Sequence, residues 1–188
     1  MKPLSGPVAG AVPPRGSGAA AVILVGFMGA GKTSVGRLLG QRLGWTFADL
    51  DDRIQAREGC SISEIFRDSG EVGFRQAEHA ALRDLLAEPG SSRRIIALGG
   101  GAFAQPENAA LLEESGAFVV FLDGPAEELF QRCQQQPLER PLRRDKEQFR
   151  ELYDKRRPAY LKARWRVDTS GKDPETIAVE VACILGLQ

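Results

Sequence analysis

A glycine-rich stretch between an apolar run and a helical pattern constrains this chain more than any other feature. It reads Gly26-Phe-Met-Gly-Ala-Gly31-Lys32-Thr33, a G-x-x-x-x-G-K-T pattern that follows Val22-Ile-Leu-Val and precedes a helical pattern from Ser34 to Leu43. Strand, glycine loop and helix in this order predict a phosphate-binding loop. The three glycines permit a tight turn in which consecutive N–H groups point at phosphate oxygens.

The polar residues of this phosphate loop each have a physical role. Lys32 supplies a cation for the outer phosphates, and the Thr33 hydroxyl can ligate Mg²⁺. The positive end of the following helix dipole lies beneath the anion. A chance match in a chain with 21 glycines among 188 residues is the alternative, but the strand and the helix around the loop argue against it. We therefore expect the chain to bind a nucleoside triphosphate.

The composition is typical of one globular domain. A chain of 188 residues, 43% hydrophobic and 27% charged, is long enough to enclose a full core. Its 25 Lys and Arg residues balance 25 Asp and Glu residues, so it lacks the overall basic field that nucleic-acid binding favours. Cys60, Cys133 and Cys183 show no C-x-x-C spacing, which predicts reduced thiols and no metal cluster.

The N-terminal segment is the least globular part of the sequence. Residues 1–20 are rich in Gly, Ala and Pro, and we expect a disordered tail before a single domain at 21–188. Lys2 and the apolar run Ala19–Met28 faintly resemble a secretory signal, but cleavage there would destroy the phosphate loop. The sequence contains no run of about 18 apolar residues, so we expect no membrane span. We expect a cytoplasmic protein.

Apolar runs alternate with helical patterns along the whole chain. Strands are expected at 22–26, 46–49, 94–98, 118–122 and 165–168, and helices at 32–44, 51–58, 62–68, 72–88, 106–115, 125–135, 147–162 and 174–186. Ser61-x-x-Glu64 is a capping box, and Pro106 and Pro174 suit the first position of a helix. This alternation predicts a parallel sheet covered by helices, with ligands bound at the carboxyl ends of its strands.

Three acidic residues follow the second expected strand, in the order Asp49-Leu-Asp51-Asp52. Residues two apart on a strand face the same way at a distance of about 7 Å. Asp49 and Asp51 are thus candidates to face the phosphate site, one toward Mg²⁺ and the other toward an acceptor hydroxyl. A helix N-terminus with acidic residues is an equally weighted alternative, and it suits Asp52 well.

A glycine triplet and an Arg–Glu pair are the next candidate features. Gly99-Gly-Gly101 follows the third expected strand, which predicts bare backbone against a bulky or polar group. The preceding segment contains Gly73-Phe-Arg75-Gln-Ala-Glu78. Arg75 and Glu78 are i,i+3 neighbours on a helix, and taken alone they predict an ordinary surface pair.

Two later segments concentrate arginines. Gln134 to Asp145 holds two prolines and has no clear period, which predicts a mobile flap, with a solvated connector as the alternative. Arg140 within it is placed to reach a phosphate when the flap closes. Tyr153-Asp-Lys-Arg156-Arg157-Pro-Ala-Tyr160 gathers cations near the end of a helix, where compensation of the helix dipole is the alternative.

In this order, these pieces resemble the shikimate kinases. The resemblance covers about residues 20–186 and rests on the phosphate loop, Asp49-x-Asp51, Gly73-Phe-Arg75 with Glu78, the glycine triplet, Arg140-Pro-Leu and Arg156-x-Pro-x-Tyr160. It implies a P-loop α/β fold like that of nucleoside monophosphate kinases, with a five-stranded parallel sheet flanked by helices, a substrate-binding helical segment at about 51–80 and a lid at about 134–146. It also implies a monomer that transfers the γ-phosphoryl of ATP, with Mg²⁺, to the 3-hydroxyl of shikimate, giving shikimate 3-phosphate and ADP on the route to chorismate and the aromatic amino acids.

The resemblance also implies a role for individual residues. Those at the ATP site are Gly29, Ala30, Gly31, Lys32, Thr33, Ser34, Arg132, Arg140 and Lys172; those at the substrate site are Asp51, Arg75, Glu78, Gly99, Gly100, Gly101 and Arg156. Thr33 and Asp49 are the implied Mg²⁺ ligands. Lys32, Asp51 and Arg140 are the implied catalytic residues, with Asp51 as the candidate base.

Three departures from the family pattern bear on these roles. One additional residue separates Arg132 from the lid, Arg143 replaces a leucine, and Asp52 is a third acid whose role could exchange with that of Asp51.

A kinase for gluconate or another small hydroxy acid on the same fold is the rival function. A GTP switch would need Asn-Lys-x-Asp, but the only asparagine is Asn108. The chain could also be an inactive homologue that only binds ligands, but the presence of every expected charged site residue argues against this.

Overall fold

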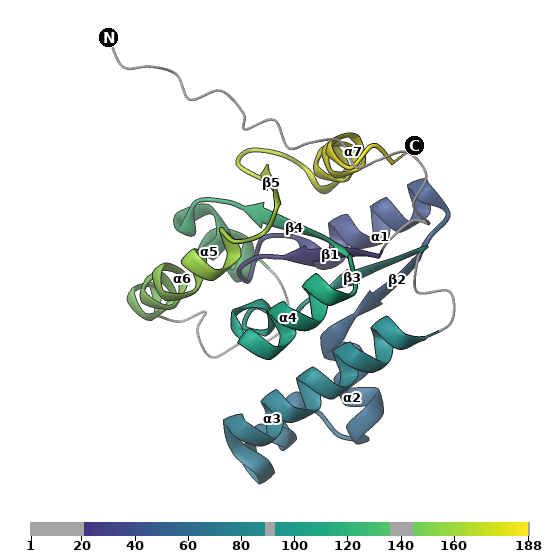
Figure 1. The fold of residues 1–188 in the computed structure, drawn as a ribbon. Helices are drawn as coiled ribbons and strands as arrows, with labels where there is room; N and C mark the ends of the chain where they lie inside the picture. The colour runs from purple at the N-terminus through teal and green to yellow at the C-terminus, as the bar shows by residue number, and fades with distance from the viewer. Residues whose placement is uncertain (1–20, 89–92, 136–144, 188) are drawn as a thin grey trace.

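The computed structural model describes residues 21–88, 93–135 and 145–187. Within them, five parallel strands form one sheet in the order β2-β3-β1-β4-β5. The strands are β1 (Val22–Val25), β2 (Thr46–Asp49), β3 (Arg94–Ala97), β4 (Phe118–Asp123) and β5 (Trp165–Asp168). Figure 1 shows the sheet between two sets of helices. The fold class and the five expected strands are confirmed, with end shifts of one residue at β1, β3 and β4.

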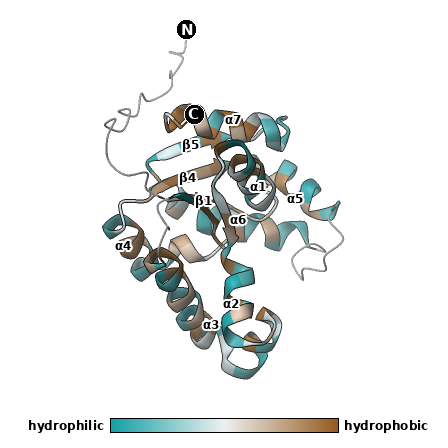
Figure 2. Cartoon of the chain, turned by 90° about the vertical axis from the view of Figure 1, so that its right-hand side faces the viewer, coloured by the Kyte–Doolittle hydropathy of each residue, from teal (hydrophilic) through white to brown (hydrophobic). Residues whose placement is uncertain are grey.

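The central position of β1 follows from its composition. All four of its residues are buried, and it pairs with β3 on one side and β4 on the other. A parallel strand covered on both faces reads as a continuous apolar run, whereas the edge strand β5 alternates buried and exposed residues. Figure 2 shows the hydrophobic colouring of β1 and β4 inside the molecule.

The helices surround this sheet in the places that the sequence predicts. They are α1 (Lys32–Leu43), α2 (Leu50–Glu58), α3 (Ile62–Ala87), α4 (Pro106–Glu114), α5 (Ala126–Gln134), α6 (Lys146–Tyr160) and α7 (Pro174–Ile184), with a short 3₁₀ turn η2 (Ala102–Ala104) after β3. Helices α1 and α7 pack together on one side of the sheet, and α4 and α6 lie on the other. None of the helices in the described residues is long and apolar enough to cross a membrane.

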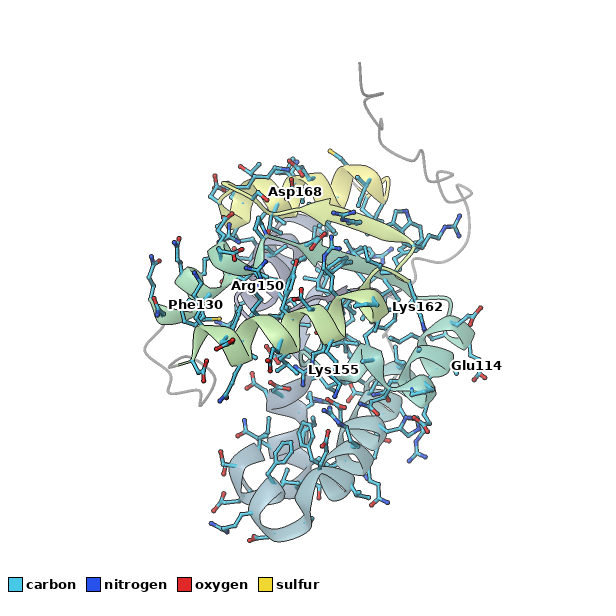
Figure 3. The ribbon with its side chains drawn as sticks, turned by 90° about the vertical axis from the view of Figure 1, so that its left-hand side faces the viewer. Glu114, Phe130, Arg150, Lys155, Lys162 and Asp168 are labelled. Carbon is cyan, nitrogen blue, oxygen red and sulfur yellow. The ribbon has the colours of Figure 1, made fainter. Side chains whose placement is uncertain are left out.

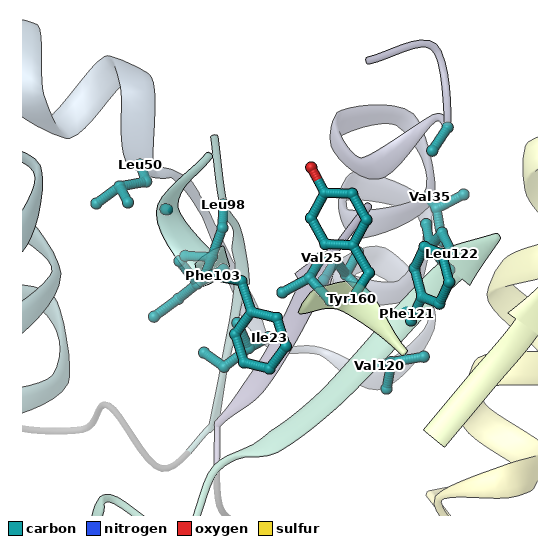
Figure 4. Packing of buried hydrophobic residues seen from close by; sticks show 14 of the residues in the cluster. Ile23, Val25, Val35, Leu50, Leu98, Phe103, Val120, Phe121, Leu122 and Tyr160 are labelled. Carbon is teal, nitrogen blue, oxygen red and sulfur yellow. The ribbon is translucent and has the colours of Figure 1, made fainter. Parts of the chain in front are cut away.

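Aromatic side chains join α6 to the sheet. The ring of Tyr160 lies 5.3 Å from that of Phe121 in β4, and the ring of Phe149 lies 4.9 Å from that of Phe27 just after β1. In Figure 4 the Tyr160 ring stands beside Val25 and Phe121 with its hydroxyl pointing away from the apolar cluster. Burial of such rings fixes the position of α6 over the carboxyl ends of the central strands.

Helices α2 and α3 project beyond the sheet, as Figure 1 shows. The expected capping box is present at the start of α3, where Glu64 N–H donates to Ser61 Oγ over 3.2 Å and Ser61 N–H donates to Glu64 Oε2 over 2.8 Å. Gly70, with φ 65° and ψ −168°, divides α3 into two helical pieces. The two helices expected at 62–68 and 72–88 are therefore continuous apart from this kink.

Strand register brings three loops to one edge of the sheet. Leu24 of β1 and Asp49 of β2 both align with Ala97 of β3. Because the strands are parallel and end together, the phosphate loop, the acidic segment and the glycine triplet emerge side by side. This arrangement places a site at the carboxyl edge, where parallel sheets bind ligands.

Candidate active site

A cleft of about 280 Å³ lies at this edge of the sheet. Most of the predicted site residues line it. The lining consists of Met28, Gly29, Gly31, Lys32, Thr33, Ser34, Asp49, Asp51, Ile62, Phe66, Phe74, Arg75, Glu78, Leu98, Gly99, Gly100, Gly101 and Arg156. The cleft thus joins the phosphate loop to side chains from α2, α3 and α6.

The phosphate loop has the backbone conformation that its glycines predict. Gly26, Gly29 and Gly31 have φ values of 148°, 82° and 84°, which L side chains rarely adopt. At Gly29 a Cβ would also come within 2.4 Å of the Leu129 carbonyl oxygen of α5. Glycine is therefore required there both by conformation and by space.

Among the α-helices of the described residues, only α1 has neither a side-chain cap nor an acidic first turn. Its N-cap is Gly31, and among the described residues no side chain caps it and no acid occupies its first turn. The helices α2, α3, α6 and α7 each have an Asp or Ser side chain as cap and an acidic first turn. Lys32 Nζ donates to the carbonyl oxygens of Gly26 and Phe27 over 2.9 and 3.0 Å. The cleft floor is therefore a positive helix end with a cation beside it.

Thr33 and Asp49 meet at the side of the phosphate loop. Thr33 Oγ1 donates to Asp49 Oδ2 over 2.8 Å, and Asp49 Oδ1 accepts from the Asp51 N–H over 3.1 Å. In the described part of the chain, no group of three or more His, Cys, Asp or Glu residues is placed to hold a metal ion. One hydroxyl and one carboxylate are the protein oxygens gathered at this point.

The strand-alternation explanation for the two aspartates is wrong. Strand β2 ends at Asp49, which is the N-cap of α2, and Asp51 lies in the first turn of that helix. The helix-terminus alternative is therefore correct for their backbone positions, yet both side chains line the cleft. Asp52 is exposed and is not among the lining residues.

Arg75 and Glu78 are not the ordinary surface pair that their spacing predicts. Arg75 Nη1 donates to Glu78 Oε2 over 2.8 Å, and the Glu78 side chain is only 1% exposed. Arg75 Nη2 donates to Glu71 Oε1 over 3.3 Å. Arg75 Nε is buried and has no hydrogen-bond partner among the described residues. A buried donor of this kind calls for an acceptor that a bound anion would supply.

Burial dominates the electrostatics of Glu78. Desolvation raises the pKa of its carboxyl, Arg75 lowers it, and the nearby Asp51 carboxylate raises it further. The net shift is upward because burial penalises the ionised form. Glu78 therefore holds Arg75 in place at a cost in electrostatic energy.

The glycine triplet presents bare backbone to three polar side chains. A Cβ at Gly99 would lie 2.8 Å from Asp51 Oδ1, and one at Gly101 would lie 2.7 Å from Arg75 Nη2. At Gly100 the nearest atom would be Arg156 Nη1 at 3.3 Å. The predicted close approach of a polar group to this backbone is confirmed.

Helix α6 supplies Arg156 and Tyr160. No role for Tyr160 was predicted from the sequence. The Tyr160 hydroxyl donates to the Gly100 carbonyl oxygen. Burial raises the pKa of Tyr160 to about 12, although Arg156 lowers it. The i,i+4 spacing of Arg156 and Tyr160 was the available signal, since such residues share a helix face. Figure 3 shows α6 lying across the molecule, with Arg150 and Lys155 labelled along it.

An aromatic wall is a second feature that sequence reasoning missed. The rings of Phe66 and Phe74 stack with centroids 4.5 Å apart across the Gly70 kink, and both line the cleft. The Arg75 guanidinium lies 5.1 Å from the Phe74 ring centroid. The cleft thus has an apolar side next to its cations.

The remaining predicted residues in the described part of the chain are not among those that line the cleft. Arg132 Nη2 donates to Glu128 Oε1 over 2.5 Å and to the Thr169 carbonyl oxygen over 2.8 Å. Lys172 Nζ donates to Glu180 Oε2 over 2.8 Å, so Arg132 and Lys172 border the turn between β5 and α7. Ala30 is buried, and its N–H donates to the Phe27 carbonyl oxygen over 3.2 Å.

Three features predicted from the sequence lie outside the described residues. They are the tail at 1–20, most of the expected lid at 134–146, and the lid arginines Arg140 and Arg143. The role expected for Arg140 remains a prediction from the resemblance.

Comparison with known proteins identifies the family. The shikimate kinase family model matches residues 28–185. A curated shikimate kinase from Persephonella marina is 40% identical over 161 residues, which span 85% of this chain and 95% of that protein. A solved shikimate kinase from Acinetobacter baumannii, in complex with shikimate, is 35% identical with a TM-score of 0.77 over 89% of this chain and 93% of that one.

A gluconokinase structure is a more distant match. The enzyme from Sinorhizobium meliloti is 19% identical, with a TM-score of 0.60 over 90% of this chain and 93% of that one. This likeness shows a common fold and nothing more. The family model and the relatives at 35% and 40% identity decide between the two families, and the chain belongs to the shikimate kinase family.

Proposed function

We propose that this chain transfers the γ-phosphoryl group of ATP to the 3-hydroxyl of shikimate, releasing ADP and shikimate 3-phosphate. The proposal rests on one observation: a loop suited to phosphate and side chains suited to a hydroxy acid line the same cleft. A phosphate loop forms its floor, and Asp51, Arg75 and Arg156 line the same cleft. A small hydroxy acid needs a carboxylate for its hydroxyls and cations for its carboxylate, and these side chains supply both.

The donor phosphates bind at the N-terminus of α1. This helix start lines the cleft and has no side-chain cap, so its first N–H groups are available to phosphate oxygens. Lys32 exchanges its contacts with the loop carbonyls for contacts with the β- and γ-phosphates. Little covalent chemistry is asked of the protein, because phosphoryl transfer depends chiefly on positioning and on neutralising charge.

The oxygens of Thr33 and Asp49 fit a Mg²⁺ ion held together with ATP. Mg²⁺ prefers oxygen ligands and is commonly bound by one or two protein groups plus substrate phosphates and water. The Thr33 hydroxyl and the Asp49 carboxylate are 2.8 Å apart beside the phosphate loop, and they are the groups that would hold the ion. When bound, Mg²⁺ supplies positive charge against the β- and γ-phosphates.

Arg75 and Arg156 bind the carboxylate of the acceptor. The planar guanidinium group matches two carboxylate oxygens at once. Glu78 orients Arg75 through the 2.8 Å ion pair, and the unpartnered Arg75 Nε is a donor that a bound carboxylate satisfies. The Phe66–Phe74 wall gives the carbon ring of the acceptor an apolar surface to pack on.

Asp51 receives the proton of the reacting hydroxyl. Its Oδ1 lies against Gly99, and Asp51 lines the same cleft as the phosphate loop. As the acceptor oxygen forms its bond to the γ-phosphorus, the O–H proton passes to the Asp51 carboxylate and the bond to the β–γ bridging oxygen breaks. Proton removal by a positioned carboxylate contributes roughly 10²–10⁴-fold to a rate.

Arg132 and Lys172 are assigned to the adenine end of the nucleotide. Their backbone and side-chain contacts meet at the turn between β5 and α7. Because the hydrogen bonds of Arg132 lie in the plane of its guanidinium, a flat face of that group can pack on an aromatic base. We further propose that the protein acts in the cytoplasm as a monomer.

A coupled assay of ADP release tests the proposal directly. Purified protein is supplied with ATP, Mg²⁺ and one acceptor at a time: shikimate, gluconate or a nucleoside monophosphate. We expect turnover with shikimate alone, and mass spectrometry should find shikimate 3-phosphate. Turnover with gluconate and none with shikimate would replace the proposed acceptor.

A further inference from the structure

The glycine triplet is held in place by a buried amide from outside the cleft. Ala102, which follows the triplet, is fully buried, and its N–H closes a turn by donating to the Gly99 carbonyl oxygen over 3.1 Å. The Ala102 carbonyl oxygen accepts from Asn108 Nδ2 over 3.0 Å. Asn108 lies in α4 and is 1% exposed. This side chain therefore fixes the position of the turn that presents Gly99 to Gly101 to the cleft.

The only histidine in the chain completes this contact. His79 Nδ1 lies 2.8 Å from Asn108 Oδ1. Since the Asn108 amide group donates to Ala102, the oxygen of the same amide faces His79 and can only accept. His79 must therefore carry its hydrogen on Nδ1. The reverse amide orientation would put two acceptors opposite each other at Ala102.

His79 and Arg75 connect the same helix to the same turn. They are i,i+4 neighbours in α3, so they share a helix face. The Arg75 guanidinium borders Gly101 directly, whereas His79 reaches Ala102 through Asn108. The two contacts together fix the spacing between α3, which carries Arg75 and Glu78, and the glycine triplet.

We propose that His79 and Asn108 are positioning residues for the acceptor site, setting the glycine triplet against Arg75 through the chain His79–Asn108–Ala102. This inference rests on the proposed shikimate kinase function, because its kinetic consequence concerns the acceptor. Neither side chain lines the cleft, so neither touches substrate. Because Nδ1 carries hydrogen in both the neutral tautomer and the imidazolium ion, protonation of His79 does not break the contact.

The first test reads the tautomer and needs no activity. In protein labelled with ¹⁵N at histidine and carrying no histidine tag, the single imidazole gives one unambiguous pair of ring nitrogen signals. We expect the Nδ1–H form at a pH where the ring is neutral, and a shift toward Nε2–H in Asn108→Leu. An Nε2–H tautomer in the wild-type protein would overturn the proposed chain of contacts.

The second test separates the acceptor from the nucleotide. We expect His79→Leu and Asn108→Leu each to raise the KM for shikimate by about 10-fold, within the range known for small displacements of positioning groups, with the KM for ATP changed less than twofold. His79→Asn keeps a donor near the position of Nδ1 and should restore the KM for shikimate to within about threefold of wild type. Gln76→Leu, at an exposed position of the same helix, is the control.

A double variant and the wild-type assay complete the design. If the residues act as one chain, His79→Leu/Asn108→Leu should have no larger effect than the stronger single variant. An equal rise of both KM values, or an unchanged KM for shikimate in folded His79→Leu, would contradict the positioning role. Should the leucine variants fail to fold, His79→Asn and the tautomer measurement decide the question. Absence of shikimate turnover in the wild type would instead contradict the proposed function.

Discussion

The two halves of the cleft are built in opposite ways. The donor half is the phosphate loop, Gly26 to Thr33, eight consecutive residues that include the uncapped start of α1 and the cation Lys32. The acceptor half, named for the proposed function, is lined by Asp51, Arg75, Gly99–Gly101 and Arg156, which come from α2, α3, the turn after β3, and α6. One half is local in sequence, and the other exists only after the chain has folded.

This contrast explains where specificity lies. A helix N-terminus and a glycine loop recognise phosphate by backbone geometry, which is independent of what the phosphate is transferred to. Recognition of the acceptor depends on side chains whose positions are set by packing between helices. Substitutions in one half should therefore affect one substrate and spare the other.

The largest expected effect is at Asp51, where the two halves meet. Asp51→Asn should lower kcat by roughly 10²–10⁴-fold, because a neutral amide cannot accept the proton of the hydroxyl. Asp52→Asn is the matched control, since Asp52 is exposed and lies outside the cleft lining. Steady-state kinetics with both substrates decides the outcome. A decrease in kcat of less than about tenfold in Asp51→Asn would reduce Asp51 to a positioning role. A large decrease in kcat in Asp52→Asn would assign the role of base to Asp52 instead.

Asp51 also shows how much of the site could be predicted from the sequence. The spacing of Asp49 and Asp51 predicts two carboxylates facing one site, but the assumed strand geometry is wrong, because β2 ends at Asp49 and a helix begins at Leu50. The phosphate loop and the five strands follow from local pattern and are confirmed. Local pattern suffices there because adjacent residues determine backbone conformation.

The acceptor half could not be derived from spacing alone. Arg75 and Glu78 read as a surface pair by i,i+3 spacing, and only the packing of α3 against its neighbours buries Glu78. The contact of Tyr160 with Gly100 joins residues 60 positions apart. Such contacts depend on tertiary structure, so the sequence indicated them only through a resemblance to a family.

The next prediction tests whether the acceptor half is independent of the donor half. Arg75→Ala should weaken shikimate binding by roughly 2–5 kcal/mol, because it leaves the substrate carboxylate and Glu78 without their partner. Isothermal titration calorimetry should find ATP affinity unchanged. Arg83→Ala is the control, since Arg83 lies in the same helix with its side chain 61% exposed. Equal losses for both ligands in Arg75→Ala would contradict the division into halves.

A smaller effect is expected in the donor half. Gly29→Ala forces a side chain into a backbone conformation with φ 82° and against the Leu129 carbonyl oxygen. Backbone strain of about 1–3 kcal/mol should weaken ATP binding by roughly 5- to 150-fold. Gly44→Ala is the control, because Gly44 has φ 65° but nothing within 4 Å of a Cβ. Loss of shikimate affinity in Gly29→Ala, with ATP affinity intact, would reverse the assignment of the loop.

The smallest expected effect sharpens the comparison through stability. The donor half is a positive helix end, but the acceptor half keeps Glu78 buried, and burial raises the pKa of that carboxyl. The folded state therefore holds the Glu78 proton more tightly than the unfolded state, and this contribution to stability is lost as the pH rises from the ordinary value of 4.5 through the raised one. Glu78→Gln removes the ionisable group, so its Tm relative to wild type should increase as the pH rises above 4.5, by roughly 2–4 °C for each kcal/mol.

Activity should move in the other direction in the same variant. A neutral amide orients Arg75 less firmly than the carboxylate 2.8 Å away, so Glu78→Gln should raise the KM for shikimate while its relative stability increases. The control is Glu71→Gln, which removes the other carboxylate near Arg75; the Glu71 side chain is 71% exposed. Parallel pH profiles of Tm for wild type and Glu78→Gln would show that the buried carboxylate carries no electrostatic cost. The precision of the acceptor half would then have to come from packing alone.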